Sequence, residues 1–245
     1  MKLLQVENLS KAFGGTVALF EASFSLEAGE RLAVIGPNGA GKTTLLNLLG
    51  GQLSPTSGQI YIRDEEITSL PSHERLQLGL ARSFQLNNLF LNLSVLDNVL
   101  LALQGANGIH FRIWQSDLSL RDLVLKAEAL LKSMNLWKRR DLQATTLSYG
   151  EQRQMEVALG LASEPKILLL DEPCAGLAAA ESANLMDMIR NLPRRTSVLF
   201  CEHDMDVVFD LADRIIVLNY GQIISEGSPD QIRIDPKVKK IYLGE

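Results

Sequence analysis

The chain carries Gly36-Pro37-Asn38-Gly39-Ala40-Gly41-Lys42-Thr43 between a short apolar segment, 31–35, and a stretch of helical apolar spacing, 43–50. This run matches the pattern G-x-x-x-x-G-K-[ST] in full. Its glycines let the backbone curl, so that successive N–H groups and a helix N-terminus face an anion. The alternative, a Gly-rich turn before an ordinary helix, is disfavoured by the strand-loop-helix context. The segment therefore predicts a phosphate-binding loop within an α/β fold.

The side chains that close this loop predict contacts to a nucleotide. We expect Lys42 to contact the β- and γ-phosphates, the Thr43 hydroxyl to bind Mg²⁺, and Thr44 to add a phosphate contact. The backbone cradle around the phosphates is expected to consist of Gly36, Pro37, Asn38, Gly39, Ala40 and Gly41.

A second polar site is expected where the apolar run Ile167-Leu168-Leu169-Leu170 ends in Asp171-Glu172. Such a continuous run is typical of a buried parallel strand, and ligands of open α/β sheets bind at the carboxyl ends of strands. Asp171 is predicted to hold Mg²⁺, and Glu172 to orient or deprotonate an attacking water. An acidic pair after a strand can also be a plain helix N-cap. The upstream phosphate loop favours the functional interpretation.

The distribution of patterns along the chain predicts one domain with an insertion. β-Rich segments separated by glycine turns open the chain, at 3–9, 17–26 and 31–35. Helical periodicity follows, with helices expected at 94–103, 120–134 and 150–163. Strands and helices alternate after Pro165, which indicates a parallel sheet flanked by helices. We expect a single domain, 1–245, with a catalytic core at 1–86 and 163–245 and an inserted helical subdomain at 87–162.

Composition excludes some classes of function. A chain of 245 residues with 46% apolar composition is long enough to form an enzyme core. A net charge of −5 and an isoelectric point near 5.4 argue against nucleic acid as the main partner. The one tight basic cluster, 138–140, is interpreted as a solvated loop. Cys174 and Cys201 form no disulfide framework and no metal spacing, which suits a reducing cytoplasm.

No segment of this sequence is expected to enter a membrane. The apolar run after Met1 is interrupted by Glu7 and is too short for a signal peptide. The longest apolar region, 89–103, contains Asn92, Asp97 and Asn98, whereas a spanning helix needs about 20 apolar residues. Any membrane role would then come through a partner.

Leu147-Ser148-Tyr149-Gly150-Glu151-Gln152 lies between the phosphate loop and the acidic strand, and it resembles the L-S-G-G-Q signature of the ATP-binding cassette (ABC) ATPase family. The resemblance covers essentially the whole chain. It implies a P-loop NTPase fold with a RecA-like parallel-sheet core, an N-terminal antiparallel β subdomain and an inserted α-helical subdomain. It also implies ATP hydrolysis with ATP and Mg²⁺ as cofactors.

Further roles follow from the resemblance alone. Ser148, Gly150 and Glu151 correspond to signature positions that bind the γ-phosphate held by a partner subunit. Gln85 corresponds to a glutamine that touches Mg²⁺, and His203 to a histidine that contacts the γ-phosphate. The resemblance thus gives Glu172, His203, Lys42 and Gln85 catalytic roles, and Thr43, Gln85 and Asp171 roles at the metal. Phe13 resembles the aromatic residue that stacks on adenine. From the residues alone, Gln85 could lie at the surface, His203 could be a loop residue and Phe13 could cap the core.

The sequence departs from the family pattern near the expected junction between subunits. Tyr149 replaces the first signature glycine, and Glu151 replaces the signature glutamine. Ala178 stands where an Asp or Asn is usual and cannot form a side-chain hydrogen bond. These departures favour pairing with a paralogous cassette, although an identical partner stays open.

The C-terminal part resembles the ATPase subunits of branched-chain amino-acid importers, on the runs 202–209, 214–221 and 226–229. The insertion-like stretch Gly105–Ser119 fits one paralogue of such systems, or else is a loop that packs on its own subdomain. The resemblance implies permease subunits, an indirect link to an extracytoplasmic substrate-binding protein, and a peripheral location at the cytoplasmic face of the inner membrane. The closing run 238–245 also resembles the cassette that powers lipopolysaccharide extraction.

Two other classes of function remain as alternatives. Non-transport ABC proteins that act on ribosomes or DNA commonly fuse two cassettes or carry long basic insertions, and this chain shows neither. A P-loop GTPase or kinase would leave residues 147–152 unexplained, and no N-K-x-D guanine motif occurs. The sequence therefore favours a transport ATPase.

Overall fold

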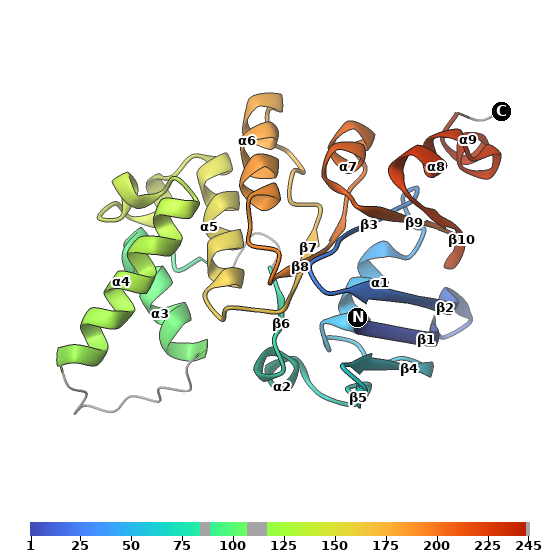
Figure 1. Ribbon diagram of the computed structural model, residues 1–245, viewed down its shortest axis with the longest axis horizontal. Coiled ribbons are helices and arrows are strands. Elements are labelled where there is room, and N and C mark those ends of the chain that lie inside the picture. The colour runs from blue at the N-terminus through green and yellow to red at the C-terminus, as the bar shows by residue number, and fades with distance from the viewer. Residues whose placement is uncertain (84–88, 107–116, 244–245) are drawn as a thin grey trace. The chain divides into compact units, whose positions relative to one another are not determined.

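The computed structural model describes residues 1–83, 89–106 and 117–243, and its contacts divide the chain into two units (Figure 1). Unit 1 comprises Met1–Leu80, Lys166–Pro173 and Pro193–Glu245. Unit 2 comprises Ala81–Pro165 and Cys174–Leu192. The insertion limits expected from the sequence, 87 and 162, stay a prediction. The contacts also assign the segment after Pro173 to unit 2.

An antiparallel sheet in the order β2-β1-β4-β5 forms the N-terminal part of unit 1, drawn in blue and teal in Figure 1. Its strands are β1 (Lys2–Phe13), β2 (Thr16–Glu27), β4 (Ser57–Ile62) and β5 (Glu65–Glu66). Val6 of β1 pairs with Phe24 on one side and with Ile60 on the other. All three are buried, because alternate residues of a strand share a face and this face covers the core. The predicted antiparallel β subdomain is confirmed.

The second sheet has the order β10-β9-β3-β8-β7-β6. Strands β3 (Arg31–Ile35), β8 (Ser197–Cys201) and β7 (Ile167–Asp171) run parallel, as do β3 and β9 (Arg214–Asn219). β10 (Gln222–Gly227) is antiparallel to β9, and the edge strand β6 spans Leu80–Arg82. Every residue of β3, β7 and β8 is buried, as expected when both faces of a parallel sheet are covered. The parallel core predicted from the sequence is confirmed.

The helix α1 (Lys42–Leu49) joins the two sheets of unit 1 into one apolar core. It buries Leu45, Leu46, Leu48 and Leu49 against apolar residues of both sheets. Its C-terminal carbonyls are held by Arg75 of α2 (Ser72–Gln77), whose guanidinium donates to Leu48 O (2.6 Å) and Leu49 O (2.8 Å). Burial lowers the pKa of Arg75 to about 10. The helix that follows the phosphate loop is therefore anchored at its C-terminal end.

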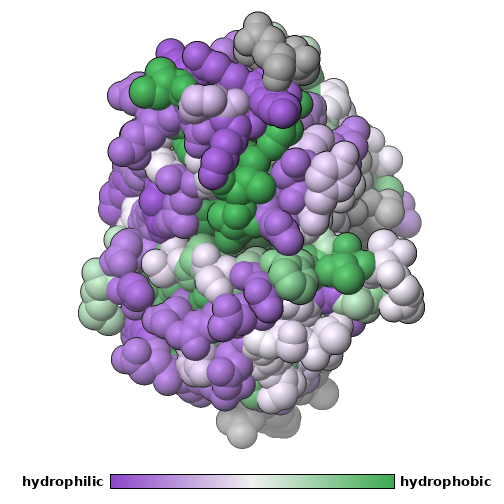
Figure 2. Space-filling view, turned by 90° about the vertical axis from the view of Figure 1, so that its right-hand side faces the viewer, coloured by the Kyte–Doolittle hydropathy of each residue, from purple (hydrophilic) through white to green (hydrophobic). Residues whose placement is uncertain are grey.

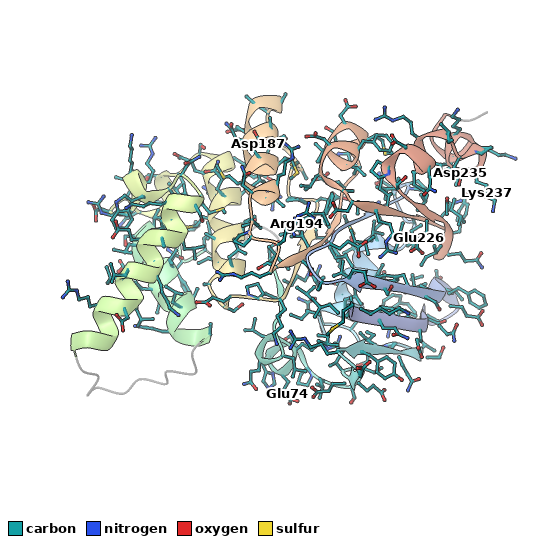
Figure 3. The ribbon with its side chains drawn as sticks, in the orientation of Figure 1. Glu74, Asp187, Arg194, Glu226, Asp235 and Lys237 are labelled. Atoms are coloured by element: carbon teal, nitrogen blue, oxygen red, sulfur yellow. The ribbon has the colours of Figure 1, made fainter. Side chains whose placement is uncertain are left out.

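The C-terminal segment packs beside β10 as α8 (Pro229–Ile234) and α9 (Pro236–Leu243). Asp235 links these helices: its carboxylate accepts a hydrogen bond from the Ser225 hydroxyl and one from the backbone N–H of Lys237 (2.8 Å). These donors lower the pKa of Asp235. Figure 3 labels Asp235 and Lys237 at this end of unit 1, together with Glu226, which pairs with Arg214.

Unit 2 is built from α3 (Val95–Ala106), α4 (Asp117–Ser133), α5 (Tyr149–Leu161) and α6 (Ala179–Arg190). α3 contacts α4 and α5, and these three helices lie side by side in Figure 1. Short 3₁₀ turns at Trp137–Arg139 and Ala144–Thr146 connect α4 to α5. The helical character predicted for this region is confirmed in the residues that the structure describes. None of the helices described is sufficiently long and apolar to span a bilayer.

Candidate nucleotide-binding site

The glycines of the loop between β3 and α1 are required by the backbone. A Cβ atom at Gly36 (φ +156°) would lie 2.1 Å from Leu218 O, and one at Gly41 (φ +105°) would lie 2.5 Å from Ala18 O. Gly39 also has a positive φ, +79°, but a Cβ there would meet no atom within 4 Å. The loop is thus pressed against its own unit at Gly36 and Gly41 and open at Gly39.

Two elements of unit 1 hold the loop from behind. The backbone N–H of Gly221, in the turn between β9 and β10, donates to Ala40 O at 2.9 Å. The same turn is tied to β2, because Phe20 N donates to Gly221 O at 2.8 Å. The antiparallel sheet and the parallel sheet therefore both support the curled backbone.

Lys42, the first residue of α1, is buried and spans the loop with its side chain. Its ammonium donates to Gly36 O at 2.8 Å and to Pro37 O at 3.2 Å. The N-cap of α1 is Gly41, which has no side chain to cap the first turn. Uncapped N–H groups at a helix start are donors for phosphate oxygens. Thr43 is exposed and Thr44 half-buried at this same end of the helix.

Three neighbouring parallel strands bring the predicted chemistry to one edge of the sheet. Val34 of β3 is in register with Cys201 of β8, and Cys201 is in register with Asp171 of β7. The phosphate loop follows β3, His203 follows β8, and Asp171 ends β7. Because carboxyl ends of adjacent parallel strands share an edge, the structure brings these segments together in unit 1.

Glu172 leaves the sheet through a strained backbone conformation. Its φ of +46° lies in the left-handed region, which is uncommon for residues other than glycine. Its N–H donates to Cys201 O at 3.0 Å, which holds this geometry in place. Strain of about 1–3 kcal/mol at such a residue persists only where surrounding contacts impose it, and it is frequent at functional sites. The neighbouring Asp171 is buried at the end of β7.

His203 is exposed next to a fully buried acid. Its side chain is 61% exposed, and its Nδ1 lies 3.8 Å from Oε2 of Glu202. The backbone N–H of His203 donates to the same oxygen at 3.2 Å. The sequence analysis did not single out Glu202, which is fully buried. The available signal was its position: it follows an apolar strand directly, much as Glu172 follows β7.

Phe13 ends β1, where it pairs with Thr16 across the hairpin, and the residue is 49% exposed. The Lys11 ammonium lies 5.1 Å from the ring centroid. Other apolar side chains of this hairpin, Val17 and Phe20, are also exposed. Figure 2 shows the side of the molecule that carries the hairpin, with apolar patches on a mostly hydrophilic surface. Stacking of Phe13 on adenine stays a prediction.

The signature segment belongs to unit 2 and begins α5. Ser148 is the N-cap: its hydroxyl accepts from Glu151 N–H (3.2 Å), and Glu151 Oε2 accepts from Ser148 N–H (2.9 Å). Glu151 Oε1 also pairs with Nε of Arg139 at 3.0 Å. Both carboxylate oxygens of Glu151 thus have partners inside unit 2. Its predicted contact to nucleotide stays a prediction.

Two sequence-based interpretations fall outside the residues that the structure describes. One is Gln85, with its expected contact to Mg²⁺. The other is most of the insertion-like stretch, 107–116, with Phe111, Ile113 and Trp114.

Comparison with known proteins shows which family the chain resembles. A family model described as "ABC transporter" matches residues 19–175, and one described as "Branched-chain amino acid ATP-binding cassette transporter" matches residues 222–245. The "High-affinity branched-chain amino acid transport ATP-binding protein LivG" of Escherichia coli (strain K12) is 38% identical over 250 residues, covering 99% of this chain and 98% of its own. The "Lipopolysaccharide export system ATP-binding protein LptB" of Acidithiobacillus ferridurans is 34% identical, covering 100% of this chain and 98% of its own.

Solved structures agree in fold. The ADP conformation of MJ1267, an ATP-binding cassette of an ABC transporter, superposes with a TM-score of 0.88 at 31% identity over 100% of both chains. A dimeric structure of the cassette MJ0796, bound to ADP and Pi, has a TM-score of 0.78 at 27% identity and covers 93% of this chain and 99% of that one. With a family model on more than half of its length and relatives matched nearly end to end, the chain belongs to the ABC transporter family and is one of its ATP-hydrolysing cassettes.

Proposed function

We propose that the protein powers the uptake of branched-chain or related amino acids through separate membrane subunits. The observation that carries the ATPase part is the shared sheet edge where the phosphate loop, Asp171-Glu172 and His203 lie. The substrate class is supported by the family match at 222–245 and by the description of the LivG relative. The sequence run 238–245, which also suggested a lipopolysaccharide cassette, lies inside that match.

Binding of ATP begins at the loop. The phosphates occupy the open side of the loop near Gly39, where a Cβ would meet no neighbour. N–H groups of the first turn of α1 bind phosphate oxygens, and Lys42 exchanges its carbonyl partners at Gly36 and Pro37 for the β- and γ-phosphates. Phe13 stacks on the adenine ring.

The site fits Mg²⁺ because that ion prefers oxygen ligands and is usually bound through one or two carboxylates together with substrate phosphates and water. The exposed Thr43 hydroxyl and the Asp171 carboxylate supply such oxygens, and Gln85 is the third expected ligand. When bound, Mg²⁺ neutralises charge that develops on the β- and γ-phosphate oxygens.

Hydrolysis depends on Glu172 and His203. The left-handed backbone at Glu172 takes the carboxylate out of the strand direction, where it orients a water and accepts its proton. His203, exposed at the same edge, contacts the γ-phosphate. The Glu202 carboxylate accepts a hydrogen bond from the backbone N–H of His203. This bond fixes the backbone from which the imidazole side chain extends.

A complete site requires a second cassette. Ser148, Gly150 and Glu151 serve the ATP bound by Lys42 of that partner, which is either an identical copy or a paralogue. The dimeric MJ0796 structure supports this arrangement. Closure and reopening of the pair drive the permease subunits, with an extracytoplasmic binding protein as an indirect partner. The cassette is then held peripherally at the cytoplasmic face of the membrane.

Replacing the proposed base tests the mechanism. Glu172→Gln keeps the size of the side chain but replaces the basic carboxylate with a neutral amide, which cannot accept the proton. We expect ATP binding to persist, turnover to fall by about 10²–10⁴-fold, and a closed dimer to accumulate with ATP. The measurements are nucleotide affinity, phosphate release and sedimentation. Turnover near that of the wild type would exclude Glu172 from this role.

The transport assignment is tested in the whole complex. Affinity purification of the tagged chain from membranes is expected to recover permease subunits, and reconstituted vesicles are expected to accumulate leucine only with ATP. Recovery of ribosomes or DNA without any membrane subunit would contradict transport. Extraction of lipopolysaccharide without leucine uptake would favour the exporter alternative.

A further inference from the structure

Tyr149 stands where the family signature has a glycine, and it contacts the turn that follows β7. Its hydroxyl donates a hydrogen bond to Ala175 O at 3.2 Å. Its ring packs on Gly176 so closely that a Cβ built there would lie 3.3 Å from ring carbon Cε1 and from the hydroxyl. Gly176 has a φ of +77°, so its backbone also favours glycine. The two residues lie three and four positions after Glu172.

A buried ion pair on α5 holds Tyr149 in this position. Nη2 of Arg153 donates to the Tyr149 hydroxyl at 3.1 Å, and the guanidinium carbon lies 5.3 Å from the ring centroid. Nη1 of Arg153 donates to Oε2 of Glu156 at 2.9 Å. Burial raises the pKa of Glu156, and the pairing with Arg153 offsets part of this rise. The Tyr149 hydroxyl thus accepts a hydrogen bond from Arg153, one helical turn further along α5, and donates a hydrogen bond to the carbonyl of Ala175.

A second contact joins the same two segments. A Cβ at Gly150 would lie 2.6 Å from Oε1 of Glu181, so the Glu181 side chain lies against the start of α5. The other carboxylate oxygen of Glu181 accepts from the backbone N–H of Ala178 at 3.2 Å. Tyr149 therefore contacts this segment at Ala175, and Gly150 lies beside the side chain of Glu181 further along it.

The network has unused hydrogen-bonding capacity. Nε of Arg153 and Oε1 of Glu156 are buried and have no hydrogen-bond partner among the residues that the structure describes. Buried polar groups are nearly always satisfied, and the exceptions are typical of sites under strain or with a function.

We propose that Tyr149 is a positioning residue that locks the turn 175–178 to the start of α5. The segment that leaves Glu172 then moves together with Ser148 and Gly150, which serve the ATP of the other cassette. The hydroxyl binds the carbonyl of Ala175 in this turn, whereas the methyl side chain of Ala178 can form no hydrogen bond. This inference rests on the proposed function, because it links two half-sites that only a working dimer uses.

The test removes only the hydroxyl, in the full transport complex. In Tyr149→Phe, we expect amide hydrogen exchange in peptides covering 174–181 to accelerate and kcat to fall, each roughly fivefold, because one hydrogen bond contributes about 1 kcal/mol. The KM for ATP is expected to stay close to that of the wild type, and the melting temperature to fall by no more than about 2–4 °C. The matched control is Tyr220→Phe, because Tyr220 is 88% exposed in the β9–β10 turn.

Tyr149→Gly adds a second arm, since it restores the residue usual in the family and removes the tether completely. It should reproduce the faster exchange of 174–181 and the lower kcat. Unchanged exchange or unchanged kcat in Tyr149→Phe would overturn the proposal, as would an equal effect of Tyr220→Phe. Wild-type turnover in Glu172→Gln would instead refute the proposed function, and the exchange measurement would still report on the contact itself.

Discussion

Gly36 and Gly39 meet two different structural requirements in the same loop. Gly36 is required because the backbone of another strand leaves no room for a side chain: a Cβ there would clash with Leu218 O. Gly39 is required only by its positive φ, and the space beside it is free. The first glycine thus sets the packing of the loop, and the second sets its curl and leaves room for a ligand.

This difference predicts unequal costs for two alanine substitutions. Gly39→Ala should lower the free energy of unfolding by about 1–2 kcal/mol, which is the usual cost of a left-handed residue. Gly36→Ala should cost more and should abolish nucleotide binding, because the loop must move away from β9. Urea denaturation and nucleotide titration measure both effects. Equal stability losses in the two variants would contradict this assignment.

The helix α5 combines a structural and a chemical demand at its first residues. Ser148 and Glu151 form a reciprocal capping box, which satisfies N–H groups that the helix itself cannot pair. The Ser148 hydroxyl is also the group that the proposed mechanism presents to the partner's ATP. Arg139, which the sequence analysis placed in a solvated loop, pairs with Glu151 and compensates part of its negative charge.

The two demands on Ser148 can be separated. Ser148→Ala should destabilise the protein by about 1 kcal/mol, whereas Ser148→Asp should retain the cap and nearly the wild-type stability. Turnover should nevertheless be lower in Ser148→Asp than in Ser148→Ala, because a carboxylate repels the γ-phosphate. Thermal melts and phosphate release, measured on the same samples, test whether the more stable of the two variants has the lower turnover. If activity follows stability, the hydroxyl has a structural role only.

For the whole molecule, the proposed mechanism links nucleotide binding to the pairing of two cassettes. Lys42 and Glu172 lie in unit 1, whereas Ser148 lies in unit 2, and the proposed mechanism requires Ser148 to come from a second molecule. A ligand that binds only the folded state stabilises it by mass action, and a ligand that also drives dimerisation makes this stabilisation depend on protein concentration.

Melting curves of Glu172→Gln test this linkage. With MgATP, the midpoint should rise with protein concentration, and without nucleotide it should not. Adding Ser148→Asp to the same chain should remove the concentration dependence but leave the shift caused by nucleotide binding. A concentration-independent midpoint with MgATP would show that identical chains do not pair, and mixing with a paralogous cassette would then be expected to restore the effect.

Much of the architecture could be predicted because its causes are local in sequence. The apolar run of β7 and the Gly-rich loop are contiguous, so periodicity and composition reveal them. α2 was missed because it has six residues and little amphipathic pattern, and it is positioned by Arg75, whose hydrogen-bond partners at the end of α1 are 26 and 27 residues away. Such a contact leaves no periodic trace.

The same distinction, between local features and features that depend on distant contacts, applies to the candidate site. The loop directly follows one apolar strand and the acidic pair directly ends another, so the sequence alone predicts a phosphate loop and carboxylates at a sheet edge. Folding determines that Glu202 is fully buried beside His203 and that Tyr149 reaches a turn 26 residues away. The physical reason is that burial and hydrogen bonding depend on residues that packing brings together from distant parts of the chain. The amino-acid sequence alone does not specify which residues become neighbours.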